Sequence, residues 1–106
     1  MTGKIKEISS DEFDKFIRDD KTVIDFWAPW CGPCKMMGPV FEEAAGDLKD
    51  KAKFGKVNVD ESSDLAQRFG IMSIPTIMFF RDGQPVDKVV GVLLKEELIK
   101  RVKEIR

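Results

Sequence analysis

The segment TVIDFWAPWCGPCK, residues 22–35, decides the fold because a strand pattern ends and a helix pattern begins inside it. Residues 22–28 are rich in β-branched and aromatic side chains and apolar on both faces, which is typical of a central, buried strand. From Cys34 through Leu48, apolar side chains recur at helical spacing. Residues 53–59, KFGKVNV, then indicate a second strand. Together the three pieces predict a β-α-β unit with two parallel strands.

The rest of the chain extends this unit into a larger sheet. In chain order, the further expected elements are a strand at 4–8, a helix with Phe13, Phe16 and Ile17 inward, a helix after Ser62 or Ser63 that Gly70 ends, strands at 76–80 and 85–92 around an Asp82-Gly83 turn, and a helix with Leu98, Val102 and Ile105 inward. Asp-Gly between two strand-like runs favours a tight antiparallel hairpin. We therefore expect an α/β fold in which helices cover a mixed sheet.

Composition and charge exclude several classes of protein. A chain of 106 residues that is 42% hydrophobic predicts one globular domain spanning 1–106. A formal net charge of −1 leaves no basic excess to attract nucleic acid. The N-terminal stretch MTGKIKEISS is charged and lacks an apolar run, so we expect neither a signal peptide nor a membrane span. These features predict a cytoplasmic protein.

The only two cysteines, Cys31 and Cys34, lie at the junction between strand and helix. Unpaired backbone amides at a helix N-terminus favour negative charge, so Cys31 is expected to be a reactive thiolate. Cys34 lies one helical turn later, within bonding reach and less exposed. This arrangement predicts dithiol–disulfide exchange, in which Cys31 attacks a substrate disulfide and Cys34 resolves the mixed disulfide.

Two other interpretations of the cysteine pair stay open. A purely structural disulfide would close a very short loop and connect no distant parts of the chain, which makes it a weak stabiliser. It would also be unusual in the cytoplasm. A structural zinc site needs four ligands, whereas the chain offers two thiols and no histidine. Carboxylates or a second subunit would have to complete such a site.

Asp25 is a carboxylate inside the apolar strand, on one face with Val23 and Trp27. Burial costs free energy and raises the pKa of a carboxyl group, so Asp25 is a candidate to accept the Cys34 proton. Lys56 lies at an equivalent depth in the next strand of the β-α-β unit and is a candidate to tune that pKa. The alternatives are a structural ion pair, or a Lys56 side chain that reaches solvent.

The segment DFWAPWCGPCK resembles the active-site segment of the thioredoxin family, and length, element order and motif spacing agree over the whole chain. The resemblance implies a thioredoxin-like fold, with a mixed sheet of about five strands flanked by four helices. It implies an enzyme that reduces disulfides of protein substrates and is itself reduced by a thioredoxin reductase. It implies no cofactor beyond the redox-active Cys31–Cys34 pair, and it supports the roles given to Asp25 and Lys56.

The same resemblance implies a docking surface around Cys31. In this family a cis-proline in an Ile-Pro-Thr segment packs against the cysteines, which here is Pro75. The surface would consist of Trp30, Gly32, Pro33, Ile74, Pro75 and Gly91. A flat apolar patch suits transient contact with many proteins. Ile74 would pair its backbone with an extended substrate strand.

Two alternatives of other functional classes remain at this point. The apolar patch would also suit a non-enzymatic subunit or clamp of a larger assembly. A dimer that carries a metal between its cysteines is the weaker alternative. We expect a monomer with catalytic thiols.

Overall fold

The computed structural model describes residues 5–106. Strands and helices follow one another in the predicted order, and their bounds are β1 (Lys6–Glu7), α1 (Phe13–Ile17), β2 (Lys21–Trp27), α2 (Gly32–Asp47), β3 (Lys53–Asn58), α3 (Ser63–Arg68), β4 (Thr76–Arg81), β5 (Gln84–Val90) and α4 (Lys95–Lys103). The expected strand at 4–8 is shorter than predicted, because β1 holds two residues; Lys4 lies outside the described residues.

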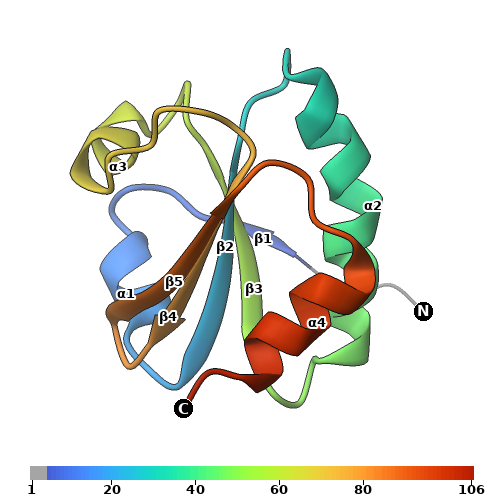
Figure 1. The fold of residues 1–106 in the computed structure, drawn as a ribbon. Helices are drawn as coiled ribbons and strands as arrows, with labels where there is room; N and C mark the ends of the chain where they lie inside the picture. Colours follow the sequence, from blue (N-terminus) through green and yellow to red (C-terminus); the bar gives the residue numbers. More distant parts are fainter. Residues whose placement is uncertain (1–4) are drawn as a thin grey trace.

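The five strands form one mixed sheet in the order β1-β3-β2-β4-β5. β1, β3 and β2 run parallel, whereas β4 pairs antiparallel with both β2 and β5. Helices α1 and α3 cover one side of the sheet, and α2 and α4 cover the other (Figure 1). The mixed, helix-covered sheet predicted from the sequence is confirmed.

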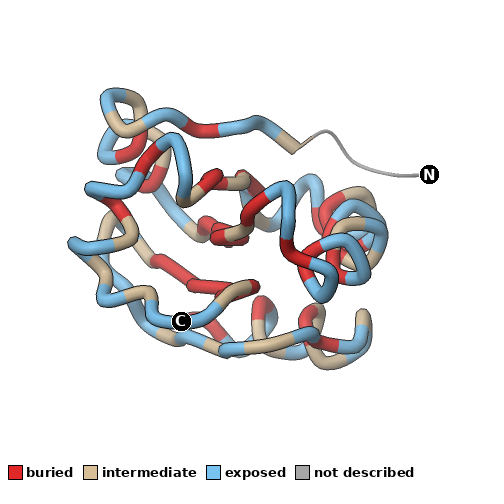
Figure 2. The backbone as a smooth tube through the Cα atoms, turned by 90° about the horizontal axis from the view of Figure 1, so that it is seen from above, coloured by how far each residue is buried: buried red, intermediate tan, exposed pale blue. Residues whose placement is uncertain are grey.

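Each side of the sheet has its own hydrophobic core. Alternate residues of β2 point to opposite sides, as the two-residue period of a strand requires. Ile24 and Phe26 pack with Phe13 and Phe80 on the α1/α3 side, and Val23 packs on the α2/α4 side. Figure 2 shows buried residues on the strands in the middle of the molecule and exposed residues on its rim. β2 is therefore the central buried strand that its composition predicts.

Helix α2 connects the sheet to the cysteines. It begins at Gly32, has Pro33 in its first turn, where a missing amide hydrogen costs nothing, and buries Met37 and Phe41 against the sheet. At 16 residues it is the longest described helix. No helix within residues 5–106 combines the length and apolar character needed to cross a membrane.

The two ends of the sheet differ in what they carry. The start of α2 lies at the carboxyl ends of β2 and β3, whereas the C-terminus and the β4–β5 turn lie at the opposite end (Figure 1). That turn has positive φ at both Asp82 (50°) and Gly83 (84°), as a tight two-residue hairpin requires. The cysteines are therefore far from the hairpin. They lie at the carboxyl ends of the parallel strands, where ligands of α/β proteins usually bind.

Candidate active site

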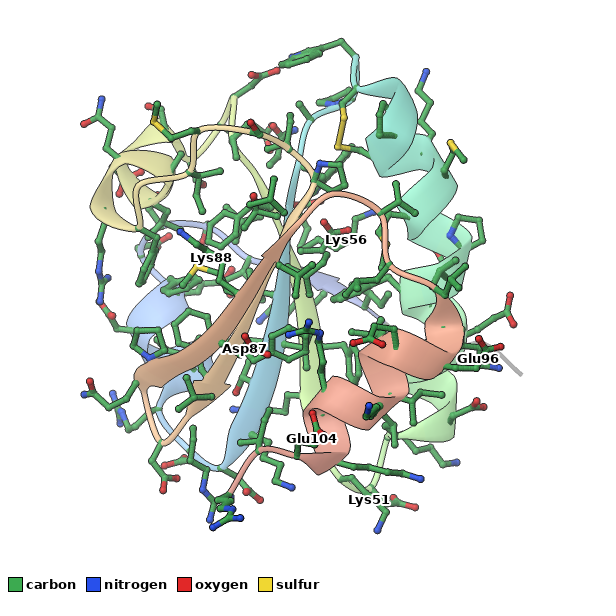
Figure 3. All side chains as sticks on the ribbon, viewed as in Figure 1. Lys51, Lys56, Asp87, Lys88, Glu96 and Glu104 are labelled. Carbon is green, nitrogen blue, oxygen red and sulfur yellow. A yellow bond between two sulfur atoms is a disulfide. The ribbon has the colours of Figure 1, made fainter. Side chains whose placement is uncertain are left out.

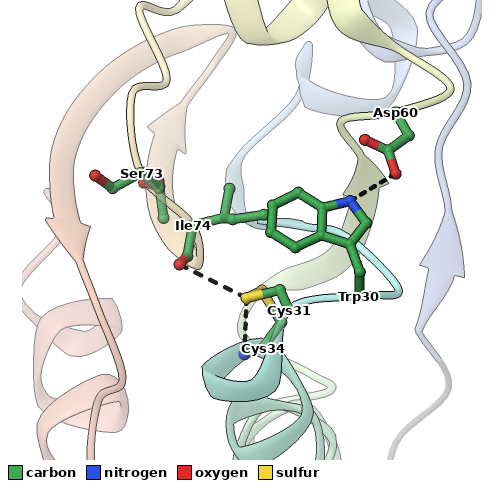
Figure 4. Close-up of a disulfide and its surroundings, with 7 residues drawn as sticks. Trp30, Cys31, Cys34, Asp60, Ser73 and Ile74 are labelled. Carbon is green, nitrogen blue, oxygen red and sulfur yellow. Dashed lines mark hydrogen bonds between the residues drawn. A yellow bond between two sulfur atoms is a disulfide. The ribbon is translucent and has the colours of Figure 1, made fainter.

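Cys31 and Cys34 form a disulfide at the start of α2, with their Cα atoms 5.2 Å apart. Cys31 is the N-cap residue, with extended backbone angles of φ −89° and ψ 112°. The backbone N–H of Cys34 donates to the Cys31 Sγ at 3.2 Å, so a sulfur accepts where a side-chain oxygen caps most helices (Figure 4). The same amide and the helix dipole would stabilise a thiolate at Cys31 after reduction.

The expected difference in exposure between the two cysteines is absent. Cys31 is 5% exposed and Cys34 is 4% exposed. Both cysteines pack with Ala28 and against the partly buried Trp27 and Ile74, and the disulfide joins them within this cluster. The two residues differ in position instead. Cys31 precedes the helix, and its Sγ lies 3.7 Å from the Ile74 carbonyl oxygen, whereas Cys34 is inside the first turn.

Asp25 lies on β2 with 1% of its surface exposed. Its Oδ1 atom is buried and has no hydrogen-bond partner among the described residues. Burial raises the pKa of Asp25 from its ordinary value of 3.8 to about 7, the positive charge of Lys56 opposes that increase, and the negative charge of Glu7 adds to it. A group with this pKa can take up or release a proton near neutral pH.

Lys56 is the residue paired with Asp25 across β2 and β3, as the sequence suggested. Its ammonium makes no ion pair with Asp25 within 4.0 Å; it lies 4.4 Å from the centroid of the Trp27 ring. The side chain is half-buried on the α2 side of the sheet (Figure 3). The positive charge of Lys56 therefore lowers the pKa of Asp25 without a direct contact, and the alternative of a structural ion pair is not what the structure has.

The residues predicted to form a docking surface are unequally exposed. Trp30 is 68% exposed, and Gly32 and Pro33 are also exposed. Ile74 is half-buried beside the cysteines, and Pro75 is buried. The Ile74–Pro75 peptide bond is cis. Pro75 therefore contributes little surface of its own for a partner to touch.

Gly91 is joined directly to this segment. Its N–H donates to the Pro75 carbonyl oxygen at 2.8 Å, and its φ of +103° favours glycine over other residues. No atom lies within 4 Å of where a Cβ would stand, so the backbone angle and not crowding accounts for glycine here.

Two acidic residues near the site were not found from the sequence. The Trp30 indole N–H donates to Asp60 Oδ2 at 2.9 Å, which fixes the exposed ring beside the cysteines (Figure 4). The Trp27 indole N–H donates to Glu7 Oε2 at 3.3 Å. Both contacts join residues that are distant in the chain, and neither carboxylate lies in a recognisable motif.

A metal site would need ligands beyond those that the described residues bring together. Within residues 5–106, no three His, Cys, Asp or Glu side chains are grouped so that they could hold a metal ion. The two sulfurs already bond to each other. What the arrangement can do chemically is exchange this disulfide with thiols and disulfides of other molecules.

Comparison with known proteins gives a consistent result. The family model described as Thioredoxin matches residues 4–104. A thioredoxin of Staphylococcus saprophyticus is 51% identical over 94 residues, covering 89% of this chain and 90% of the relative, and one of Staphylococcus aureus is 49% identical over the same coverage. Among solved structures, the Malassezia sympodialis thioredoxin Mala s 13 has a TM-score of 0.88 at 46% identity, covering 96% of this chain and 90% of the other.

Proposed function

The chain belongs to the thioredoxin family and is a thiol–disulfide oxidoreductase, and we propose that Cys31 and Cys34 reduce disulfides of other proteins in two successive exchanges. The observation that carries the proposal is the position of the disulfide. Cys31 caps α2 and accepts a backbone N–H, so its sulfur can bear negative charge when the bond is reduced.

In the first exchange the Cys31 thiolate attacks one sulfur of the substrate disulfide. A bond forms between Cys31 Sγ and that sulfur, the substrate S–S bond breaks, and the other substrate sulfur leaves as a thiolate. The Ile74 carbonyl, 3.7 Å from Cys31 Sγ, is placed to accept a hydrogen bond from an extended substrate backbone alongside.

In the second exchange Asp25 acts as the proton acceptor for Cys34. The Asp25 carboxylate takes the thiol proton, and the Cys34 thiolate attacks Cys31 Sγ. The mixed disulfide breaks, the remaining substrate sulfur leaves as a thiolate, and the Cys31–Cys34 bond forms. The pKa of Asp25, about 7, suits a base that works at neutral pH, and the charge of Lys56 keeps it from rising further.

Partners follow from the chemistry. Each turnover leaves the protein oxidised by one electron pair, so a reductant must restore the dithiol, and we assign this role to a thioredoxin reductase. The substrates are proteins with exposed disulfides, which dock on Trp30, Gly32, Pro33, Ile74 and Gly91. No cofactor takes part besides the cysteine pair itself.

We further propose that residues 1–106 form a single domain and that the protein works as a monomer. Its cytoplasmic location stays a prediction from the sequence. A protein that reduces disulfides through its own dithiol must work in a compartment where thiols stay reduced, and the cytoplasm is such a compartment.

A Cys34→Ser variant tests the exchange mechanism. Without the resolving thiol, the second exchange cannot occur, so the variant is expected to accumulate a covalent mixed disulfide with a model protein disulfide through Cys31. Mass spectrometry of non-reduced adducts measures it, and Cys31→Ser, which should form none, is the matched control. Failure of Cys34→Ser to capture a disulfide partner would refute the assignment. A double Cys→Ser variant with full biological activity would support a non-enzymatic subunit instead.

A further inference from the structure

Three ionisable side chains form a row across the parallel strands β1, β3 and β2. Glu7 pairs with Lys56, and Lys56 pairs with Asp25, so the three share one register level. Residues paired across a parallel sheet point to the same side, which here is the side of α2 because Phe54, two residues before Lys56, packs there. An acidic, a basic and an acidic group therefore follow one another from the sheet edge to the buried centre.

Trp27 connects the outer part of this row to its centre. Glu7 Oε2 accepts the indole N–H at 3.3 Å, and the Lys56 ammonium lies 4.4 Å from the ring centroid. A cation over an indole face is attracted to it, so the ring holds the ammonium while the carboxylate holds the ring. Trp27 is also on the Asp25 face of β2, two residues further along.

We propose that Glu7 is a positioning residue for proton transfer at Asp25, because its carboxylate fixes the Trp27 indole and places a negative charge in the row that Lys56 shares with Asp25. The inference rests on the proposed role of Asp25 as the proton acceptor for Cys34. It adds a residue from β1, the shortest strand described, to a site whose other members come from β2, β3, the start of α2 and the segment before β4.

The charges around Asp25 give the direction of the effect. Lys56 on β3 favours the ionised carboxylate, and Glu7 on β1 disfavours it. The partner on β4 is Ile77, the α2 residues packed on this side include Met37 and Phe41, and none of these carries charge. Cys31 and Cys34 hold no titratable thiol in the disulfide form. Removing the charge of Glu7 therefore leaves Lys56 unopposed and lowers the pKa of Asp25.

The first test measures the titration of the Asp25 carboxyl carbon by NMR in the oxidised protein. Two strand spacings place the charges on the order of 10 Å apart, so we expect Glu7→Gln to lower the midpoint by about 0.3 to 1 pH unit. The glutamine oxygen can still accept the indole N–H, so the Trp27 indole signal should stay near its wild-type position. Glu61→Gln is the matched control, since Glu61 is also exposed and acidic but does not act on Asp25.

Glu7→Ala separates the positioning effect from the charge effect. It removes the hydrogen-bond acceptor as well, so we expect the midpoint to fall at least as far and the Trp27 indole N–H signal to move. The proposal is overturned if Asp25 titrates in Glu7→Gln as it does in Glu61→Gln. It is equally overturned if Glu7→Ala leaves the indole signal unchanged.

A kinetic measurement distinguishes this failure from failure of the proposed function. The rate at which Cys34 resolves a preformed mixed disulfide should rise with pH as Asp25 ionises, and Glu7→Gln should shift that profile to lower pH by the same amount as the NMR midpoint. If Asp25→Asn resolves the mixed disulfide at the wild-type rate, the proton-acceptor role is wrong, whatever the NMR midpoints show. If Asp25→Asn is slow but the Glu7→Gln profile does not move, only the role of Glu7 is wrong.

Discussion

The two sides of the sheet each bury one polar atom that has no hydrogen-bond partner in the described part of the chain, and the two atoms differ in kind. On the α1/α3 side it is the hydroxyl of Thr22; on the α2/α4 side it is Oδ1 of Asp25. Ile24 and Phe26 of β2 pack on this side of the sheet, together with Phe13 of α1 and with Phe69 at the end of α3. This side is therefore an aromatic core with one defect, the unpaired Thr22 hydroxyl, which is neutral.

The difference shows which of the two unpaired groups can take part in chemistry as well as destabilise the fold. An unpaired hydroxyl costs the same free energy at any pH, because it does not ionise in the accessible range. An unpaired buried carboxyl costs much less free energy when protonated than when charged, so its cost depends on pH. Only the second kind of defect can exchange protons, and it lies on the side that carries the cysteines.

The largest expected effect comes from breaking the aromatic side. Phe13 is fully buried, with ring centroids 5.4 Å from Phe69 and 5.8 Å from Phe80. Phe13→Ala leaves a cavity and should lower the free energy of unfolding by about 3 to 5 kcal/mol. Chemical denaturation measures the loss. Because Phe13 is not among the residues packed around the cysteines, disulfide reduction per folded molecule should be unchanged. A proportional loss of activity would show that the two sides are not independent.

The second effect comes from removing the ionisable defect with Asp25→Asn. The folded-state pKa of about 7 lies above the ordinary 3.8, so protonation of Asp25 stabilises the fold, and this stability is lost as pH rises through about 7. A difference of about 3 pH units corresponds to about 4 kcal/mol at most. We expect the oxidised variant to gain stability relative to wild type between pH 4 and pH 8, by up to this amount.

Unfolding of both oxidised proteins at the two pH values checks this prediction. At each pH the free energy of unfolding of the variant is subtracted from that of the wild type, so that the contributions of the other carboxylates cancel. A difference that stays constant between pH 4 and pH 8 would contradict the raised pKa of Asp25.

The smallest effect comes from removing the neutral defect. Thr22→Val replaces the hydroxyl by a methyl group of similar shape, and should raise the free energy of unfolding by about 1 kcal/mol. Thermal unfolding at pH 5 and pH 8 should show the same gain at both, in contrast to Asp25→Asn. If the variant is instead destabilised, the Thr22 hydroxyl has a favourable interaction, and within residues 5–106 only the Asp25 side of the sheet buries an unpaired polar atom.

Several elements, near the cysteines and far from them, could be predicted because local patterns specify them. The strand at β2, the helix after Cys34 and the Asp82-Gly83 hairpin each follow from side-chain period or turn chemistry within a few residues. The face that Asp25 shares with Val23 and Trp27 follows from the two-residue period of a strand. These predictions needed no knowledge of which strands pair.

Contacts that depend on strand pairing could not be predicted. The Glu7–Trp27 hydrogen bond requires the register of β1 against β3, and the two residues of β1 are too few for their sequence to fix that register, although a strand was predicted there. The position of Lys56 over the Trp27 ring, away from Asp25, depends on a competition between an aromatic face and a carboxylate. The near-equal burial of Cys31 and Cys34 depends on packing against Ile74, which is distant in the chain.

The placement of the C-terminus at the end of the sheet opposite the start of α2 has a practical consequence. A tether attached after Arg106 would leave Trp30 and the cysteines facing away from the support. The chain can therefore be immobilised on a bead or an electrode in one defined orientation, with every copy presenting its dithiol to the passing solution.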